Sequence, residues 1–247
     1  PPQSFGGAGN STHDLAQGLR TADHEIFVVT VCSKKEDEQG WTDYQGLKVF
    51  KIYANYHARW RAYLSLYNPQ TVSKVEKIIK DLKPDIVHAN NIHQFLSYAC
   101  LEIAQKSGAA VFFTARDVMT FSYGKLATKK YLKTMNCRVS WFDSLQQARK
   151  RYNPLRNLLV RKYLRCADNI FAVSGALKEA METNGIKNVT VSYTGIDVKD
   201  LEVSEEKVKE FREKHDLVNK KVIFFGGRIS GLKGSEQAKE ALERVKG

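Results

Sequence analysis

Residues 83–115 read KPDIVHANNIHQFLSYACLEIAQKSGAAVFFTA, and this stretch decides the fold class. Pro84 ends a helical pattern, and Asp85–Ala89 (DIVHA) is a short apolar segment typical of a buried strand. Phe95–Lys106 has helical spacing, and Ala110–Thr114 (AVFFT) is again strand-like. A strand, a helix and a second strand in this order predict parallel pairing, because the helix carries the chain back across the sheet.

The same alternation continues on both sides of this stretch. The predicted strands are Ile26–Cys32, Leu47–Ala54, Asn169–Val173 and Asn188–Tyr193, and the predicted helices are Gln70–Leu82, Leu155–Arg165 and Gly175–Thr183. A long irregular, basic insertion is predicted between the strand that ends at Thr114 and the helix that begins at Leu155. The pattern is typical of an α/β fold with a doubly wound parallel sheet and helices on both faces. Ligands bind beyond the carboxyl ends of the strands in such sheets, so polar residues after each strand are the site candidates.

The pattern changes after Asp197 and indicates a second domain. Ser204–His215 is a highly charged helical segment, Lys221–Phe225 (KVIFF) is strand-like, and Glu236–Val245 is helical again. The part of this second domain that the sequence contains, residues 220–247, is only about 28 residues long, which is too short to bury a core of its own. The predicted parts are a first domain (1–196), a linker with the charged helix (197–219), and the start of a second domain (220–247).

The amino end, PPQSFGGAGNSTHDLAQGL, is predicted to be a loop that leads into a helix, with no strand before it. We therefore expect the chain to be a fragment that lacks the first strand of its first domain and most of its second domain.

The composition is that of an ordinary globular chain. The 247 residues are 43% hydrophobic and 27% charged, which excludes a disordered or collagen-like chain. No apolar run approaches the roughly 20 residues of a membrane-spanning helix. The four cysteines (Cys32, Cys100, Cys137 and Cys166) lie far apart without a CxxC pair, which argues against a zinc site or disulfide scaffold and fits a reducing compartment. No His/Cys/carboxylate cluster has ligand spacing, so we expect no metal and no other cofactor.

Most of the net charge of +12 is concentrated in residues 125–165. This segment has twelve basic residues and one acid, Asp143, and Tyr131, Trp141, Phe142 and Tyr152 are interleaved with the charges. Such a surface attracts polyanions: nucleic acid, anionic lipid headgroups or a phosphorylated substrate. A solvated basic face without a partner is the alternative. We expect no nucleic-acid partner, because no helix-turn-helix, RNA-recognition or zinc-finger signature is present.

Two glycine-rich segments could hold phosphate groups. Gly6-Gly7-Ala8-Gly9 precedes a predicted helix with Asn10, Ser11 or Thr12 as N-cap, and a helix start favours an anion. The second segment, GGRISGLKG at 226–234, contains Arg228 and Lys233, which could bracket a diphosphate. A plain loop and two solvated cations on a turn are the respective alternatives.

Other candidates follow the predicted strands. The candidate substrate-binding residues are His88, Asn90, Ser174 and Gly175. As alternatives, Ser174 could be only a helix N-cap, and the histidines at the end of the strand DIVHA, His88 and His93, could have a structural role. Arg116-Asp117 follows the strand VFFT, where the carboxylate could position a sugar hydroxyl or pair locally. The sequence contains no GxSxG, P-loop or Cys–His nucleophile pattern.

The order of the motifs resembles glycosyltransferase family 4, which has the GT-B fold. The motifs are PPQSFGGAG, KPDIVHANNIH, VFFTARDVMTFSYGKL, FAVSGALKEAMETNGI, VSYTGIDV and FFGGRISGLKG. The resemblance implies two Rossmann-like domains, of which the first mainly binds the acceptor and the second the nucleotide-sugar. It also implies metal-independent transfer with retention of anomeric configuration. Arg228 and Lys233 match the family's cations on the donor diphosphate, and Gly6 and Gly7 match its glycine loop at the donor phosphate.

The sequence departs from the family pattern at several positions. Arg116 stands before Asp117 where the family often has a His, and Arg cannot act as a hydrogen-bond acceptor. Thr194 replaces the Asn of the family's Asn-Gly-Ile-Asp, and Gly9 stands where a Glu is common. The family's carboxylate pair for the donor sugar and ribose would lie beyond Gly247. We expect this fragment to be inactive by itself.

Together these features predict a retaining hexosyltransferase that uses a nucleotide-sugar donor and a glycan or lipid-linked acceptor. Cell-surface polysaccharide or glycolipid assembly, at the inner face of the plasma membrane, would suit the basic segment. Arg116 and Asp117 are the candidate catalytic residues. A nucleotide-sugar 2-epimerase of the same fold and a non-catalytic polyanion-binding protein remain as alternatives.

Overall fold

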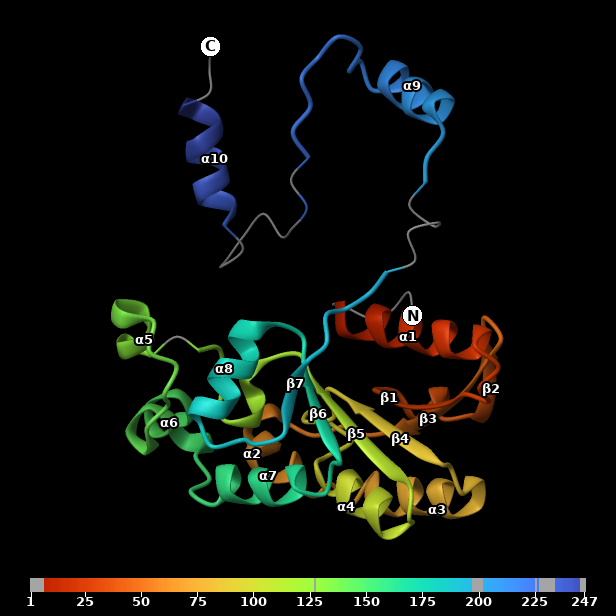
Figure 1. Ribbon diagram of the computed structural model, residues 1–247, viewed down its shortest axis with the longest axis vertical. Coiled ribbons are helices and arrows are strands. Elements are labelled where there is room, and N and C mark those ends of the chain that lie inside the picture. The colour runs from red at the N-terminus through yellow and green to blue at the C-terminus, as the bar shows by residue number, and fades with distance from the viewer. Residues whose placement is uncertain (1–6, 127, 197–201, 225, 227–233, 245–247) are drawn as a thin grey trace. The chain divides into compact units, whose positions relative to one another are not determined.

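The computed structural model describes residues 7–126, 128–196, 202–224, 226 and 234–244 (Figure 1). The chain divides into two compact units, Pro1–Ile196 and Asp197–Gly247.

A four-stranded parallel sheet is the centre of the first unit. Its strand order is β4-β5-β6-β7, in the order of the sequence. The strands are β4 (Ile86–Asn90), β5 (Ala110–Ala115), β6 (Asn169–Ala172) and β7 (Val189–Val191). All three pairs are parallel, as the alternation of strands and helices predicts. The carboxyl ends of the four strands therefore share one edge of the sheet.

A second sheet of three strands has one antiparallel member. β1 (Phe27–Cys32) pairs in parallel with β3 (Leu47–Tyr53), and β2 (Gly40–Tyr44) pairs antiparallel with β3. β2 was missed from the sequence. Gln45 and Gly46 connect β2 to β3 with φ angles of 52° and 77°, the positive values that a tight two-residue hairpin requires.

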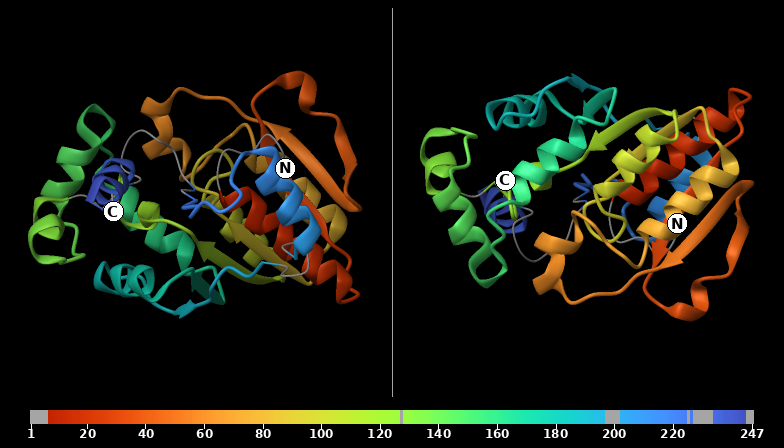
Figure 2. Two further views of the ribbon diagram at one scale, coloured as in Figure 1. Left: turned by 90° about the horizontal axis from the view of Figure 1, so that it is seen from above. Right: turned by 90° about the horizontal axis from the view of Figure 1, so that it is seen from below.

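The helices cover the sheets from both sides, as predicted. Figure 1 shows α1 on one side of the strands and α3, α4 and α7 on the other. Figure 2 gives the views from above and from below. Their bounds are α1 (Gly7–Thr21), α3 (Val72–Leu82), α4 (Ala99–Lys106), α7 (Arg156–Leu164) and α8 (Gly175–Thr183).

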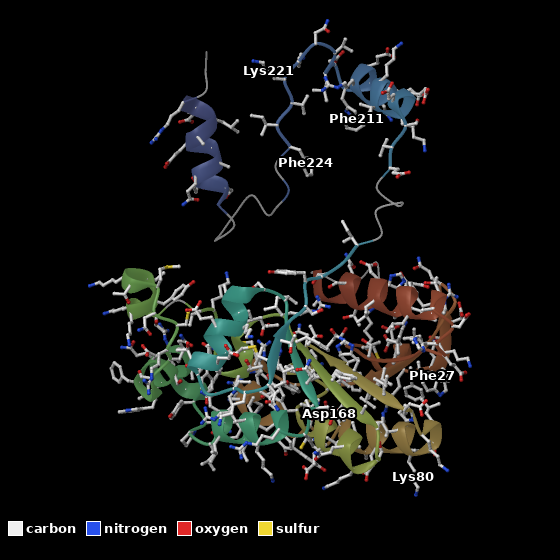
Figure 3. All side chains as sticks on the ribbon, in the orientation of Figure 1. Phe27, Lys80, Asp168, Phe211, Lys221 and Phe224 are labelled. Atoms are coloured by element: carbon white, nitrogen blue, oxygen red, sulfur yellow. The ribbon has the colours of Figure 1, made fainter. Side chains whose placement is uncertain are left out.

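The main core lies between the parallel sheet and α3, α4, α7 and α8. Leu101 of α4 and Val111 of β5 are fully buried, and Phe113 is 1% exposed and packs against Tyr98 with ring centroids 6.1 Å apart. Asp168, labelled in Figure 3 just before β6, accepts a hydrogen bond at Oδ2 from the Val111 amide at 2.7 Å. This bond joins the starts of β5 and β6.

The basic insertion is more regular than the sequence predicts. It contains α5 (Lys129–Thr134) and α6 (Trp141–Ala148). Thr128 caps α5 by accepting a hydrogen bond from the Tyr131 amide at 3.1 Å. A reciprocal capping box between Ser140 and Asp143 starts α6. The expectation of an irregular segment was wrong, because capping residues start these short helices where apolar periodicity is weak.

The described residues of the second unit, 202–224, 226 and 234–244, contain two helices, α9 (Glu205–Lys214) and α10 (Ser235–Arg244). The predicted strand at Lys221–Phe225 was wrong for residues 221–224, which carry no strand. Their side chains remain in water: Ile223 is 68% exposed and Phe224, labelled in Figure 3, is 89% exposed. A strand needs a hydrogen-bonded neighbour, and the described residues of this unit provide none.

Candidate functional site

The carboxyl edge of the parallel sheet brings together polar residues from three of its strands. Asn90 is the last residue of β4, Arg116 directly follows β5, and Thr194 lies three residues beyond β7. Arg116 donates from Nη2 to Asn90 Oδ1 and from Nη1 to Thr194 Oγ1, both at 3.3 Å. The guanidinium therefore links the ends of three strands.

Arg116 is half-buried, and burial lowers its pKa. Its Nε is buried and has no hydrogen-bond partner among the residues described. Because every nitrogen of a guanidinium is a donor, Arg116 can position neighbouring groups or attract an anion, but it cannot accept a proton or a hydrogen bond.

Asp117 has two differently occupied oxygens. Oδ1 accepts a hydrogen bond from the Met119 amide at 2.9 Å and so caps a short 3-10 turn, Val118–Thr120. Oδ2 lies 3.7 Å from His93 Nε2, and the side chain is 43% exposed. The turn fixes the carboxylate, and its exposed side remains accessible to a ligand hydroxyl.

His93 is the buried partner of Asp117. Its side chain is 5% exposed. Burial lowers the pKa of His93 to about 4, with Arg61 and Arg156 acting in the same direction and Asp117 in the opposite one. His93 is therefore a neutral imidazole in the folded protein at neutral pH.

His88 lies within β4 and away from the end of the strand. Its Nε2 is 2.7 Å from Thr114 Oγ1 on β5, and its ring packs beside the stacked rings of Phe112 and Phe171, at centroid distances of 6.4 and 6.0 Å. Burial, and then the charge of Arg116, lower the pKa of His88. These contacts give His88 structural partners inside the sheet layer.

Ser174 and Gly175 lie at the start of α8, one residue (Val173) beyond the end of β6. Ser174 Oγ accepts a hydrogen bond from the Leu177 amide at 3.2 Å and is the N-cap of the helix. Gly175 is exposed, and a Cβ at this position would meet no atom within 4 Å. The pair therefore forms an open, capped helix start at the same edge as Asn90 and Arg116.

The first helix begins earlier than the sequence predicts. α1 starts at Gly7, so Asn10, Ser11 and Thr12 are inside the helix and the prediction that one of them is the N-cap was wrong. The hydroxyl groups of Ser11 and Thr12 donate instead to the carbonyl oxygens four residues earlier, those of Gly7 and Ala8. A Cβ at Gly7 would meet nothing within 4 Å, so its surroundings are open.

Three of the predicted phosphate-binding residues, Gly6, Arg228 and Lys233, lie outside the described residues. Their proposed role therefore rests on the sequence.

Sequence reasoning missed the arginines next to this edge. From the sequence, Arg156 was counted among the surface charges of the basic segment. This prediction was wrong, because the residue is only 2% exposed. Arg61, from α2 (Arg61–Leu64), is half-buried near His93. The α7 sequence RNLLVRKYL mixes charged and apolar residues, and no local signal distinguishes the buried Arg156 from the half-buried Arg161 or the exposed Lys162.

Within the ranges that the structure describes, no group of three or more His, Cys, Asp or Glu side chains could hold a metal ion. None of the helices in those ranges is both long enough and apolar enough to span a membrane.

The parallel sheet, the helices on both sides and the polar carboxyl edge define the class of protein: a Rossmann-like α/β fold. Comparison with known proteins gives the family. The profile described as Glycosyltransferase Family 4 matches residues 5–200, and the chain belongs to this family. The predicted family and the GT-B-type fold class are thereby confirmed.

Individual relatives are more distant. A protein of Klebsiella pneumoniae, "Uncharacterized 42.6 kDa protein in cps region", is 32% identical over 130 residues, which are 47% of this chain and 34% of that protein. The crystal structure of Anabaena HepE in complex with UDP has a TM-score of 0.57 and 17% identity, over 98% of this chain and 55% of HepE. A UDP-N-acetylglucosamine 2-epimerase structure has a TM-score of only 0.31 at 16% identity, over 68% of this chain and 48% of that one. The chain thus spans about half the length of HepE, and its match covers about a third of the Klebsiella protein.

Proposed function

We propose that this protein is a retaining glycosyltransferase that moves a hexose from a nucleotide-sugar to a glycan or lipid-linked acceptor. The observation that carries the proposal is the family match over residues 5–200, a range that contains every strand of both sheets. The structure of HepE contains UDP, so UDP-sugars are the first donors to test. The proposed setting is cell-surface polysaccharide or glycolipid biosynthesis.

In the proposed mechanism, Asp117 orients the acceptor. One carboxylate oxygen is held by the Met119 amide, and the exposed side of the group can accept a hydrogen bond from a sugar hydroxyl. Arg116 holds the strand ends in place through Asn90 and Thr194. Because Arg116 replaces a His and cannot accept a hydrogen bond, Asp117 is the acceptor that remains in this pair.

Positive charge, without a metal, stabilises the leaving group in this proposal. Arg228 can bind two phosphate oxygens side by side, and Lys233 adds a point charge. Stabilisation of the charge that develops on the leaving diphosphate is a large contribution in group transfer. Gly6 and Gly7, which lack side chains, allow the backbone to approach the same phosphate.

The test is nucleotide release by the full-length protein with a panel of UDP-, GDP- and dTDP-sugars, with and without membrane lipid. Release from one donor that depends on lipid supports transfer to a membrane acceptor and identifies the donor. Interconversion of the sugar without an acceptor indicates an epimerase instead. No release from any donor by the folded protein contradicts the transferase proposal and favours a polyanion-binding role.

The donor site is tested by Arg228→Ala and Lys233→Ala in the same assay. Each should abolish transfer, because removal of one charged donor of this kind typically lowers kcat by about 100- to 1,000-fold. Lys220→Ala is the matched control, since Lys220 is an exposed cation just before the glycine-rich segment. Normal turnover in both test variants contradicts the assignment.

We also propose that residues 125–165 bind the anionic inner face of the plasma membrane. Exposed apolar side chains accompany the basic residues here: Leu132 and Trp141 are each 71% exposed, Met135 69% and Phe142 53%. Basic charge next to exposed aromatic and aliphatic groups is typical of interfacial membrane binding. Each cation near such a surface contributes about 1 kcal/mol before screening.

The membrane proposal is tested by sedimentation with liposomes that contain an anionic phospholipid. Reversal of Lys129, Lys130 and Lys133 to Glu should release the protein from these liposomes and leave nucleotide affinity unchanged. The control reverses three exposed lysines elsewhere, Lys77, Lys80 and Lys187, and so changes the net charge equally. Unchanged lipid binding by the first variant, or equal loss in both, contradicts the proposal.

A further inference from the structure

A small cavity lies beyond the carboxyl ends of β4 and β5, next to the His93–Asp117 pair. Its volume is about 40 Å³. Segments far apart in the sequence form its wall, and the residues that matter most are Arg61, Ser65, His93, Tyr123, Arg151 and Arg156.

Hydrogen bonds between these segments hold the wall in place. Tyr123 donates from its hydroxyl to the carbonyl oxygen of Asn153 at 2.5 Å, and the Asn153 amide donates back to the Tyr123 oxygen at 3.2 Å. Asn153 Nδ2 also donates to the carbonyl oxygen of Ala62, at 3.2 Å. These bonds fix Tyr123 and Ala62 in the wall, whereas Arg151, which also lines the cavity, is an exposed side chain.

Positive charge dominates the cavity. Arg61, Arg151 and Arg156 all line it, and across the described ranges none of the three has a carboxylate oxygen within 4 Å. Asp117 is the acid that acts on Arg156 and on His93 through its charge. Three cations near one carboxylate leave an excess of positive charge, which an anion from outside the chain would balance.

Arg156 is the most buried of the three, at 2% exposure. Its guanidinium donates to the carbonyl oxygen of Met119 and to Asn157 Oδ1, and it lies 4.8 Å from the Tyr123 ring centroid. These neutral groups fix its orientation but do not balance its charge. Burial of an ion without a carboxylate in contact is costly, and an anion bound beside Arg156 would lower that cost.

The cavity also has unused donors. Arg61 Nε and Ser65 Oγ are both buried without a hydrogen-bond partner among the residues described, and Ser65 is 1% exposed. Buried polar atoms are almost always paired in native structures. The three arginines, one of which carries the unpaired Nε, and the Ser65 hydroxyl together form a suitable surface for the oxygens of a ligand.

We propose that this arginine cavity binds a compact oxyanion, a phosphoryl or carboxylate group, as a substituent of the acceptor molecule. Its volume of about 40 Å³ holds roughly three water-sized groups at about 10–15 Å³ each, which admits the oxygens of one such group and excludes a sugar ring. Assignment of the group to an acceptor rests on the proposed transferase function, whereas oxyanion binding itself does not. An anion held here places the rest of the molecule beside Asp117, whose Oδ2 is 3.7 Å from His93.

The test is isothermal titration of the 247-residue chain at constant ionic strength with inorganic phosphate, glucuronate and, as the neutral comparison, glucose. Arg61→Ala and Arg151→Ala should each weaken oxyanion binding at least tenfold. Arg165→Ala is the matched control, because Arg165 is an exposed arginine at the end of α7 that does not line the cavity. Arg156 is left intact because its loss could prevent folding, and circular dichroism checks the fold of each variant.

Saturable binding of phosphate alone assigns a phosphoryl group, and binding of glucuronate alone assigns a carboxylate. Absence of saturable binding by either anion, binding of glucose equal to theirs, or equal weakening in Arg165→Ala overturns the proposal. Oxyanion binding without sugar transfer by the full-length protein would refute the proposed transferase function and leave the proposal of an oxyanion site intact. Sugar transfer without oxyanion binding would refute the oxyanion site and leave the transferase function intact.

Discussion

His93 is a buried histidine whose protonation should make the stability of the protein depend on pH. Its side chain is 5% exposed, and burial lowers its pKa from 6.5 to about 4. As the pH falls through 6.5, the unfolded chain takes up a proton at His93 and the folded protein does not. The unfolded state then binds more protons, so the free energy of unfolding falls as the pH decreases from 6.5 to 4.

The size of this effect follows from the two pKa values. Linkage with pKa values of about 6.5 unfolded and about 4 folded predicts that His93 alone removes about 2 kcal/mol of stability between pH 7 and pH 5. The stabilising contribution is fully present above pH 6.5 and is lost progressively towards pH 4. In His93→Gln this part of the pH dependence should disappear, because Gln does not titrate.

The assay is urea unfolding followed by circular dichroism at about pH 7, 6 and 5, for the wild type and His93→Gln. The difference between the two proteins removes the contributions of carboxylates and of His88, which are common to both. His24→Gln is the control, since His24 is exposed and its replacement removes no buried group. If the wild type and His93→Gln lose the same stability between pH 7 and 5, within about 0.5 kcal/mol, the burial argument for His93 is refuted.

Three further predictions concern the scaffold that holds the site. Asp168→Ala leaves the buried Val111 amide without its side-chain acceptor and should lower the free energy of unfolding by about 1–3 kcal/mol, whereas Asp168→Asn should lose less; urea unfolding distinguishes them. Leu101→Ala creates a cavity at a fully buried position and should lower that free energy by about 2–5 kcal/mol, visible as a lower Tm; a loss under 1 kcal/mol would contradict the packing. Ser140→Ala removes the capping box with Asp143 and should destabilise α6 by about 1 kcal/mol, measured as faster amide hydrogen exchange in α6 with α8 unchanged.

Much of the fold could be predicted from the sequence because its signals are local. The period of apolar residues predicted α3 at Gln70–Leu82, and the helix occupies Val72–Leu82. The predicted helix Gly175–Thr183 is α8, and Ser174, for which an N-cap was the alternative to substrate binding, is its N-cap. β2 was missed because its five residues alternate between half-buried and exposed positions, so no apolar run marks it.

The candidate site was predictable in its location but not in its contacts. Parallel strands bring their carboxyl ends to one edge, and this rule placed Asn90, Arg116 and Ser174 there. It could not predict that Arg116 bonds to Asn90 and Thr194, 26 and 78 residues away in the sequence. Such contacts depend on the conformations of the loops that follow β4, β5 and β7, and the local sequence does not specify those conformations.

The sequence by itself determined the alternation of strands and helices, the family and the concentration of positive charge in residues 125–165, because each is a property of neighbouring residues or of their order. Only the tertiary structure decided which charges are buried. Arg156 lies in the arginine cavity while other basic residues of the same segment, such as Arg165, remain in water. The physical reason is that burial and hydrogen-bond pairing depend on groups brought together from distant segments, as when Asn153 donates to Ala62, 91 residues earlier in the chain.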